Sequence, residues 1–169
     1  MDALILGAGY ATRLYPLTQD RPKPLLPVGG VPILERICGQ LGDAGAFDAI
    51  HVVTNHRFAG HYYNWLRDYQ HHRALPVAIE IFDDLTSTPD DRLGAIGDIQ
   101  FVIEDGPLDD DVVVIAGDNL ISAAARRKAQ RHDFYPGRPR FGGPLLEEEL
   151  AVDAVRVPHQ DVRPSAGAA

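Results

Sequence analysis

Short apolar runs alternate with amphipathic stretches over the first two-thirds of the chain. Consecutive apolar and β-branched residues predict strands, and apolar residues three and four positions apart predict helices between them. The predicted strands are Ala3–Leu6, Ala49–Thr54, Val77–Phe82 and Asp111–Ala116, and the predicted helices start at Pro32, include Phe58 to Tyr69, and run from Leu93 to Ile103. This alternation predicts an α/β fold with a doubly wound, mostly parallel open sheet.

The loops that follow the strands are where such a sheet binds ligands, because the carboxyl ends of parallel strands meet at one edge. The loops at residues 7–31, 54–57, 83–93 and 117–120 therefore form one predicted site.

The pattern changes in the last part of the chain. No strand is predicted from Arg126 onward, where prolines interrupt every long pattern, and Leu145–Val155 is predicted as one short helix. We therefore divide the chain into a core of residues 1–125 and an atypical, poorly structured tail of residues 126–169.

Composition narrows the class of protein. The 169 residues suit one domain, and the single cysteine, Cys38, excludes an internal disulfide. A net charge of −8 disfavours nonspecific nucleic-acid binding, which needs many cations along the phosphate backbone. No segment approaches the ~20 apolar residues of a membrane span, and Met1 leads directly into a strand without a signal peptide. We expect a cytoplasmic protein that binds neither nucleic acid nor membrane, and the sequence leaves homo-oligomer formation open.

A glycine-rich loop with two cations follows the first predicted strand. Gly7 and Gly9 let the backbone turn where a side chain would clash, and N–H groups exposed by such a turn can face phosphate oxygens. Arg13 and Lys23 can complete an anion site in a loop that several prolines stiffen. The alternative is an ordinary turn with incidental charges, which the coincidence of these features disfavours.

Asp118 directly follows the last predicted strand. Its carboxylate suits Mg²⁺, which usually takes one or two protein oxygens together with phosphates and waters, and the alternative is a cap for a following helix. A position opposite Arg13 and Lys23 favours the metal. These residues predict chemistry at phosphorus, which needs positioning and charge neutralisation more than a protein nucleophile.

Other polar residues give weaker signals. The histidines at positions 51, 56, 61, 71 and 72 lack the spacing usual for zinc on a helix. Asp84 and Asp98 can line the predicted site or serve as caps and turn residues, and the sequence leaves both roles open.

Residues 3–31 resemble the signature of the sugar nucleotidyltransferases, also called nucleotide-sugar pyrophosphorylases. The first strand, the glycine-rich loop with Thr12–Thr18, and Pro22–Val28 carry this resemblance. It continues more loosely through Val53–Asn55, Asp91–Asp98 and Gly117–Asp118, and covers about residues 1–120. It implies a Rossmann-like nucleotide-binding core. The implied enzyme transfers a nucleoside monophosphate from a triphosphate to a sugar-1-phosphate or similar phosphorylated alcohol, releases pyrophosphate and uses Mg²⁺.

The resemblance also implies roles for individual residues. Arg13 would bind the triphosphate and stabilise departing pyrophosphate, Lys23 would neutralise charge at the reacting phosphates, and Asp118 would hold Mg²⁺. The residues implied to contact the nucleotide are Leu6, Gly7, Ala8, Gly9, Gly94 and Ala95.

The chain departs from the family pattern at two places. Ala11 stands where the family commonly has a loop glycine, and we expect the loop to tolerate its methyl group. Family members also add strands for the sugar pocket after the Gly-Asp strand, often with a Glu-Lys-Pro stretch and a later Asp that supplies a second metal ligand. Only 51 residues follow Asp118 here, and neither feature is present in them. We therefore hypothesise a truncation or frame shift after Leu120.

Three alternatives to an active sugar nucleotidyltransferase follow. The first is a noncatalytic nucleotide-binding remnant. A dinucleotide-dependent oxidoreductase is disfavoured because a long proline-rich loop, and no helix, follows the glycine turn. A P-loop kinase is disfavoured because no Gly-Lys-Ser/Thr sequence occurs.

Overall fold

The computed structural model describes residues 1–74, 76–106, 108, 111–119 and the backbone strand at 154–157. A five-stranded sheet, in the order β5-β4-β1-β6-β7, forms its centre. The strands are β1 (Asp2–Leu6), β4 (Ala49–Thr54), β5 (Ala78–Asp83), β6 (Val112–Ala116) and β7 (Ala154–Val157). All neighbouring pairs are parallel except β6 and β7, which are antiparallel. The predicted mostly parallel open sheet is thus confirmed.

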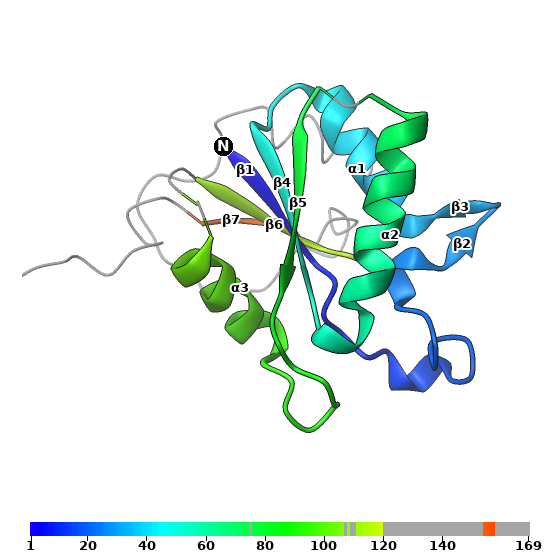
Figure 1. Cartoon of the computed structure of the whole chain (residues 1–169). Helices are drawn as coiled ribbons and strands as arrows, with labels where there is room; N and C mark the ends of the chain where they lie inside the picture. The colour runs from blue at the N-terminus through cyan, green and yellow to red at the C-terminus, as the bar shows by residue number, and fades with distance from the viewer. Residues whose placement is uncertain (75, 107, 109–110, 120–153, 158–169) are drawn as a thin grey trace, which may run out of the picture.

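Helices cover both faces of the sheet (Figure 1). Helices α1 (Ile33–Ala44) and α2 (His56–His72) pack on one face, and α3 (Gly94–Asp105) packs on the other. Alternation along β4 explains this, since Val52 lies in the core cluster beneath α1 and α2 while Val53 lies in the cluster with Val102 of α3. The strand is therefore apolar on both sides, as in other doubly wound sheets.

The long segment between β1 and α1 contains only short elements. These are the 3₁₀ turns η1 (Thr12–Leu14) and η2 (Lys23–Leu25), and the two-stranded ribbon of β2 (Pro27–Val28) and β3 (Val31–Pro32). Gly29 and Gly30 form its turn with φ of 59° and 82°, which glycine adopts without steric penalty. The segment folds beside the carboxyl end of β1.

Strand β7 corrects the prediction for the tail. No strand was expected after Arg126, yet residues 154–157 pair with β6 in the register Val112↔Val157. Residues 154 and 155 therefore belong to a strand and not to the predicted helix at Leu145–Val155, whose remaining residues lie outside the described ones. The short Ala-Val-Arg-Val run has no pattern that predicts a strand. It forms one because the edge of β6 offers backbone groups with which it can pair.

None of the helices in the described ranges combines the length and apolar character needed to cross a bilayer.

Candidate active site

The start of the glycine-rich loop is held by hydrogen bonds to β4, to α2 and to Asn55 between them. The N–H of Gly7 bonds to the carbonyl of Val53 at 2.8 Å, and the carbonyl of Gly7 accepts from the Tyr62 hydroxyl at 3.0 Å. The Asn55 side chain donates to the carbonyl of Ala8 at 2.7 Å. Because the Gly7 N–H is already bonded, it is not available to a phosphate. No hydrogen bond among the described residues engages the N–H of Ala8 or Gly9, so these amides remain candidates.

Close packing explains two of the glycines. A Cβ at Gly7 would lie 2.7 Å from the Tyr62 hydroxyl and 2.9 Å from the Val53 carbonyl. A Cβ at Gly117 would lie 2.5 Å from the carbonyl of Leu6. Such distances leave no room for a side chain, so both glycines let adjacent strand ends approach closely. A Cβ at Gly9 meets nothing within 4 Å, and Gly9 is exposed.

Ala11 adopts the left-handed conformation that the loop requires, with φ 47° and ψ 41°. Its carbonyl accepts a hydrogen bond from the hydroxyl of the buried Thr18 at 2.8 Å. The loop therefore forms despite the absence of a glycine at this position, as expected. The methyl group costs about 1–2 kcal/mol in this conformation, an amount that other loop contacts must offset.

Lys23 and Asp118 meet across the site. Lys23 lies at the start of η2, Asp118 follows β6, and the Lys23 ammonium donates to the Asp118 carboxylate at 2.5 Å. About a third of each side chain is exposed, 34% for Lys23 and 36% for Asp118. The structure thus brings together two of the three charged residues that the sequence singled out.

Arg13 lies apart from this ion pair. It is exposed on η1, and no hydrogen bond or ion pair among the described residues joins it to Lys23 or Asp118. The Arg57 guanidinium donates to the carbonyl of Gln19 at 2.8 Å, which anchors the loop segment that follows η1 to α2.

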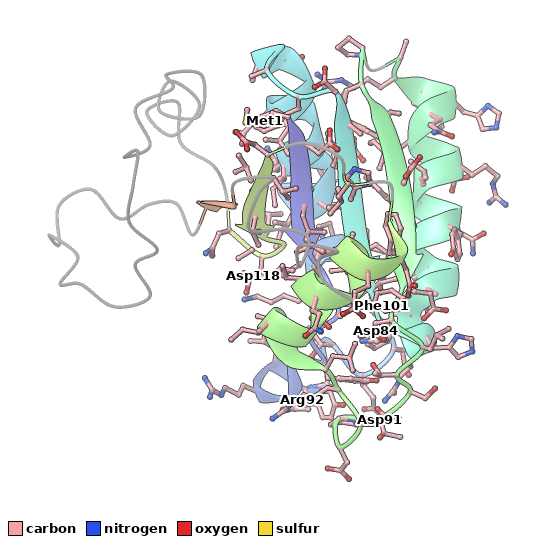
Figure 2. The ribbon with its side chains drawn as sticks, turned by 90° about the vertical axis from the view of Figure 1, so that its left-hand side faces the viewer. Met1, Asp84, Asp91, Arg92, Phe101 and Asp118 are labelled. Atoms are coloured by element: carbon pink, nitrogen blue, oxygen red, sulfur yellow. The ribbon has the colours of Figure 1, made fainter. Side chains whose placement is uncertain are left out.

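The loop after β5 is tied to the end of β4 and the start of α2. The Asp84 N–H bonds to the carbonyl of Thr54, and the His56 N–H bonds to the carbonyl of Thr86, both at 2.8 Å. The loop leads to Gly94, which opens α3 with φ 75°, and to the exposed Ala95. Asp84 and Asp91 lie at the end of the molecule opposite Met1, as Figure 2 shows.

The loops predicted to form one site therefore contact one another through these bonds. The sheet topology supports the same position for the site, because β1 lies between β4 and β6 at the point where the strand order reverses. Ligands bind at such switch points in open α/β sheets.

Comparison with known proteins identifies the family. Residues 2–137 match the family model described as nucleotidyl transferase. The chain belongs to the nucleotidyl transferase family. Among relatives, it is 31% identical over 157 residues to a UTP–glucose-1-phosphate uridylyltransferase, AglF, of Haloferax volcanii, an alignment that covers 90% of this chain and 56% of the relative. It is 66% identical over 41 residues to the bifunctional protein GlmU of Methanococcus aeolicus, covering 24% of this chain and 10% of the relative.

Two solved structures show the same fold. HddC from Yersinia pseudotuberculosis, complexed with GMP-PN, aligns with a TM-score of 0.55 and 24% identity over 69% of this chain and 47% of that one. A putative glucose-1-phosphate thymidylyltransferase from Bacillus anthracis aligns with a TM-score of 0.57 and 25% identity over 77% and 49%. The chain therefore spans about half the length of these structures.

Two residues that hold the glycine-rich loop in place were not singled out from the sequence, although Asn55 lies in the predicted loop at residues 54–57. Asn55 both caps α2, accepting from the N–H of Phe58 at 3.0 Å, and holds the carbonyl of Ala8. An asparagine directly between a strand and a helix signals the cap, but nothing local signals the second bond. Tyr62 lies within the predicted helix that includes Phe58 to Tyr69, and no role in the site was predicted for it. Burial raises the pKa of its phenol, so it stays a neutral donor to Gly7.

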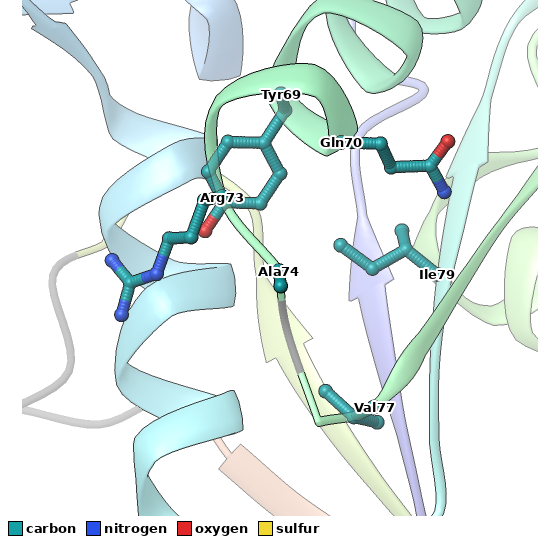
Figure 3. A pocket seen from close by; sticks show the side chains of 6 residues that line it. All are labelled: Tyr69, Gln70, Arg73, Ala74, Val77 and Ile79. Carbon is teal, nitrogen blue, oxygen red and sulfur yellow. The ribbon is translucent and has the colours of Figure 1, made fainter.

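A pocket elsewhere on the chain is separate from this site. It lies between the last turn of α2 and the start of β5, so it is at the amino end of that strand (Figure 3). Its lining residues are Tyr69, Gln70, Arg73, Ala74, Val77 and Ile79. Ligands of open α/β sheets bind at the carboxyl end, so this pocket is not part of the candidate active site.

Proposed function

We propose that the chain binds a nucleoside triphosphate with Mg²⁺ and transfers its nucleoside monophosphate to a sugar-1-phosphate or a similar phosphorylated alcohol. The observation that carries the proposal is the ion pair of Lys23 with Asp118 beside the glycine-rich loop. The names of the relatives support it, since AglF acts on UTP and glucose-1-phosphate and another relative is a putative mannose-1-phosphate guanyltransferase.

In the proposed reaction an oxygen of the sugar phosphate attacks the α-phosphorus of the triphosphate. A new P–O bond forms there, the bond to the bridging oxygen breaks, and pyrophosphate leaves with that electron pair. Lys23 neutralises charge at the reacting phosphates and Arg13 stabilises the departing pyrophosphate. Both cations act by electrostatic stabilisation, and no covalent protein intermediate is needed.

The residues present fit a magnesium ion that is shared with the substrate. Asp118 offers a partly exposed carboxylate next to the Lys23 ammonium. No group of three or more His, Cys, Asp or Glu side chains in the described ranges is placed to hold a metal. Mg²⁺ is commonly bound through one or two carboxylates plus phosphates and water, so Asp118 would hold it only together with the triphosphate. When bound, the ion supplies charge neutralisation at the phosphate oxygens.

Without a ligand, Lys23 and Asp118 neutralise each other. An arriving triphosphate offers Lys23 phosphate oxygens in place of the carboxylate, and frees Asp118 for the metal. Because both side chains are about one-third exposed, this exchange of partners requires no buried charge to be left alone.

Thermal unfolding with Mg²⁺ and each common triphosphate in turn tests the proposal. A ligand present at 100 times its Kd stabilises the folded chain by about 2.7 kcal/mol, which raises the midpoint clearly. We expect one triphosphate to do so, and we expect pyrophosphate release when sugar-1-phosphates are added. A shift without pyrophosphate release would support the noncatalytic remnant. No shift with any triphosphate would contradict both the active enzyme and the nucleotide-binding remnant.

Substitutions in the long loop test the roles of its cations. Lys23→Ala and Arg13→Ala should each weaken triphosphate binding or turnover at least about tenfold, since a charge-assisted hydrogen bond contributes roughly 1.5–3 kcal/mol. Arg21→Ala removes an exposed cation from the same loop and is the matched control, for which we expect less than a twofold change. Unchanged kinetics in Lys23→Ala or Arg13→Ala would remove that residue from the mechanism.

A further inference from the structure

Two carboxyl groups are buried at the site end of the molecule, and the mechanism above uses neither. Asp84 follows β5 and Asp98 lies in the second turn of α3, and each is only 5% exposed. The location of Asp84 is labelled in Figure 2. Buried carboxyl groups need partners, because an isolated charge loses its hydration.

The hydrogen bonds to Asp84 and Asp98 leave one oxygen of each carboxyl group without a donor. One oxygen of Asp84 accepts from the Thr86 N–H at 2.8 Å and from the Thr86 hydroxyl at 2.7 Å. The other oxygen, Oδ2, and Oδ1 of Asp98 are buried without a protein donor. The two carboxyl groups nevertheless interact with each other. Two carboxylates have no donor between them, so a hydrogen bond between these side chains needs one proton, held on either carboxyl group.

The charges around the pair are acidic. Asp84 acts on Asp98, and Asp83, from the end of β5, acts on Asp84. Burial, followed by the charge of Asp84, raises the pKa of Asp98 to about 7. Burial also raises the pKa of Asp84, against the effect of its bonds from Thr86. The pair therefore keeps one proton up to a pH well above the usual pKa of an aspartate.

The pair connects α3 to the rest of the site. The carbonyl of Thr86, whose N–H and hydroxyl bond to Asp84, accepts the N–H of His56 at the start of α2. Asp98 is one turn from Gly94 and Ala95 on the same helix. On the premise of the proposed function, we propose that the proton shared by Asp98 and Asp84 positions the first turn of α3, with Gly94 and Ala95, beside the bound nucleoside.

Asp98 and Asp84 are positioning residues in this proposal and do not touch substrate. Loss of the proton places two negative charges in a buried contact, and separation of α3 from the β5 loop relieves the repulsion. Nucleotide affinity then falls with the population of the protonated form, because apparent affinity scales with the fraction of protein that is competent to bind.

The first arm of the test uses the free protein, so it does not depend on nucleotide binding. Carbon NMR of ¹³C-labelled aspartate follows the carboxyl titrations, and hydrogen exchange follows the amides of residues 84–98. We expect one carboxyl signal that is absent in Asp98→Asn to titrate near pH 7, and faster opening of the amides above that pH. A titration of Asp98 near pH 4 would overturn the shared proton.

The second arm measures the Kd of the triphosphate that gives the largest thermal shift, at saturating Mg²⁺ and at pH 6.5 and 8.5. The wild-type affinity should fall about tenfold between these values, and that of Asp98→Asn, whose amide can donate at both, less than about twofold. Asp84→Asn is a second variant with the same expectation. Asp105→Asn, an exposed acid on the same helix, should follow the wild type.

Equal pH dependence in the wild type and both pair variants would overturn the positioning role. Failure of every triphosphate to bind would overturn the proposed function and the nucleotide part of this inference. The NMR titration and amide exchange would still decide whether the shared proton holds α3.

Discussion

At the scale of single residues, Gly7 is one of two glycines of the site at which a side chain has no room. A side chain there would meet the Tyr62 hydroxyl and the Val53 carbonyl, both of which also hydrogen-bond Gly7. Gly7→Ala should therefore lower the free energy of unfolding by roughly 1–3 kcal/mol, as overpacking in a core does. Urea denaturation measures this loss.

Gly9→Ala is the matched control for that substitution. The position is exposed, has no strained φ and offers open space for a Cβ. We expect no loss, and a gain of up to about 0.5–1 kcal/mol from the reduced entropy of the unfolded chain. Equal destabilisation by both substitutions would show that the close contacts at Gly7 do not cause the loss of stability in Gly7→Ala.

Asp98 makes stability depend on pH in a predictable direction. Its pKa is about 7 in the folded chain and about 3.9 in an unfolded one, so the folded state holds the extra proton between these values. Stability attributable to Asp98 therefore falls as pH rises from about 4 to about 7 and is level above. Asp98→Asn removes this loss.

Denaturation of wild type and Asp98→Asn at pH 5 and pH 8 provides the measurement. The variant should gain on the order of 2 kcal/mol relative to wild type between the two pH values, since each tenfold change in proton affinity corresponds to about 1.4 kcal/mol. Asp105→Asn, which is exposed, should show no such change. A constant difference between wild type and Asp98→Asn at both pH values would be inconsistent with a proton on Asp98.

At the scale of elements, Asn55 joins the start of α2 to the glycine-rich loop through the cap on Phe58 and the bond to Ala8. Asn55→Ala removes both, with a cost of about 1 kcal/mol for the cap and about 1–3 kcal/mol for a buried carbonyl left unbonded. We expect a total loss of roughly 2–3 kcal/mol by urea denaturation. Asn64→Ala, on an exposed position of the same helix, should cost under about 0.5 kcal/mol.

The same contacts explain which elements could be predicted from the sequence. Strands such as Val112–Ala116 and helices such as α1 have apolar periodicity that belongs to the residues themselves. The pairing of Lys23 with Asp118 and the second bond of Asn55 join residues far apart in the chain, and no local pattern encodes them. The carboxyl ends of parallel strands predicted the neighbourhood of the site, while its individual bonds required the fold.

Strand β7, unlike β6, could not be predicted from its own residues. Its four residues have too little local preference to be predicted, and the edge of β6 supplies the missing hydrogen-bond partners. Burial of Asp84 and Asp98 likewise depends on α3 packing over the β5 loop, which is why the sequence left their roles open.

At the scale of the whole molecule, the sheet places β1 between β4 and β6, the strands that lead to two other loops of the site. Loops from β1, β4, β5 and β6 then meet at one edge, so Lys23 of the first loop meets Asp118, which follows the last parallel strand. The described residues therefore include the loops that the proposed function assigns to the nucleotide. The sugar half remains a proposal, because the chain spans about half the length of the solved relatives.

The last prediction concerns the edge of this sheet. In the described part of the chain β6 lies between β1 and β7, and its sequence, Val112–Ala116, is wholly apolar. A chain ended after residue 153 loses β7 and leaves the backbone groups of an apolar strand unpaired, which favours pairing between copies. A chain ended after residue 157 keeps β7 and is the matched control.

We expect the chain of residues 1–153 to melt at a lower temperature than the chain of residues 1–157 and to associate as its concentration rises. Scanning calorimetry and sedimentation velocity measure the two effects. The control should match the full-length chain in both, because the pairing of Val112 with Val157 is retained. If the two shortened chains behaved alike, β7 would contribute nothing to the stability of the sheet, and β6 would be protected by another part of the chain.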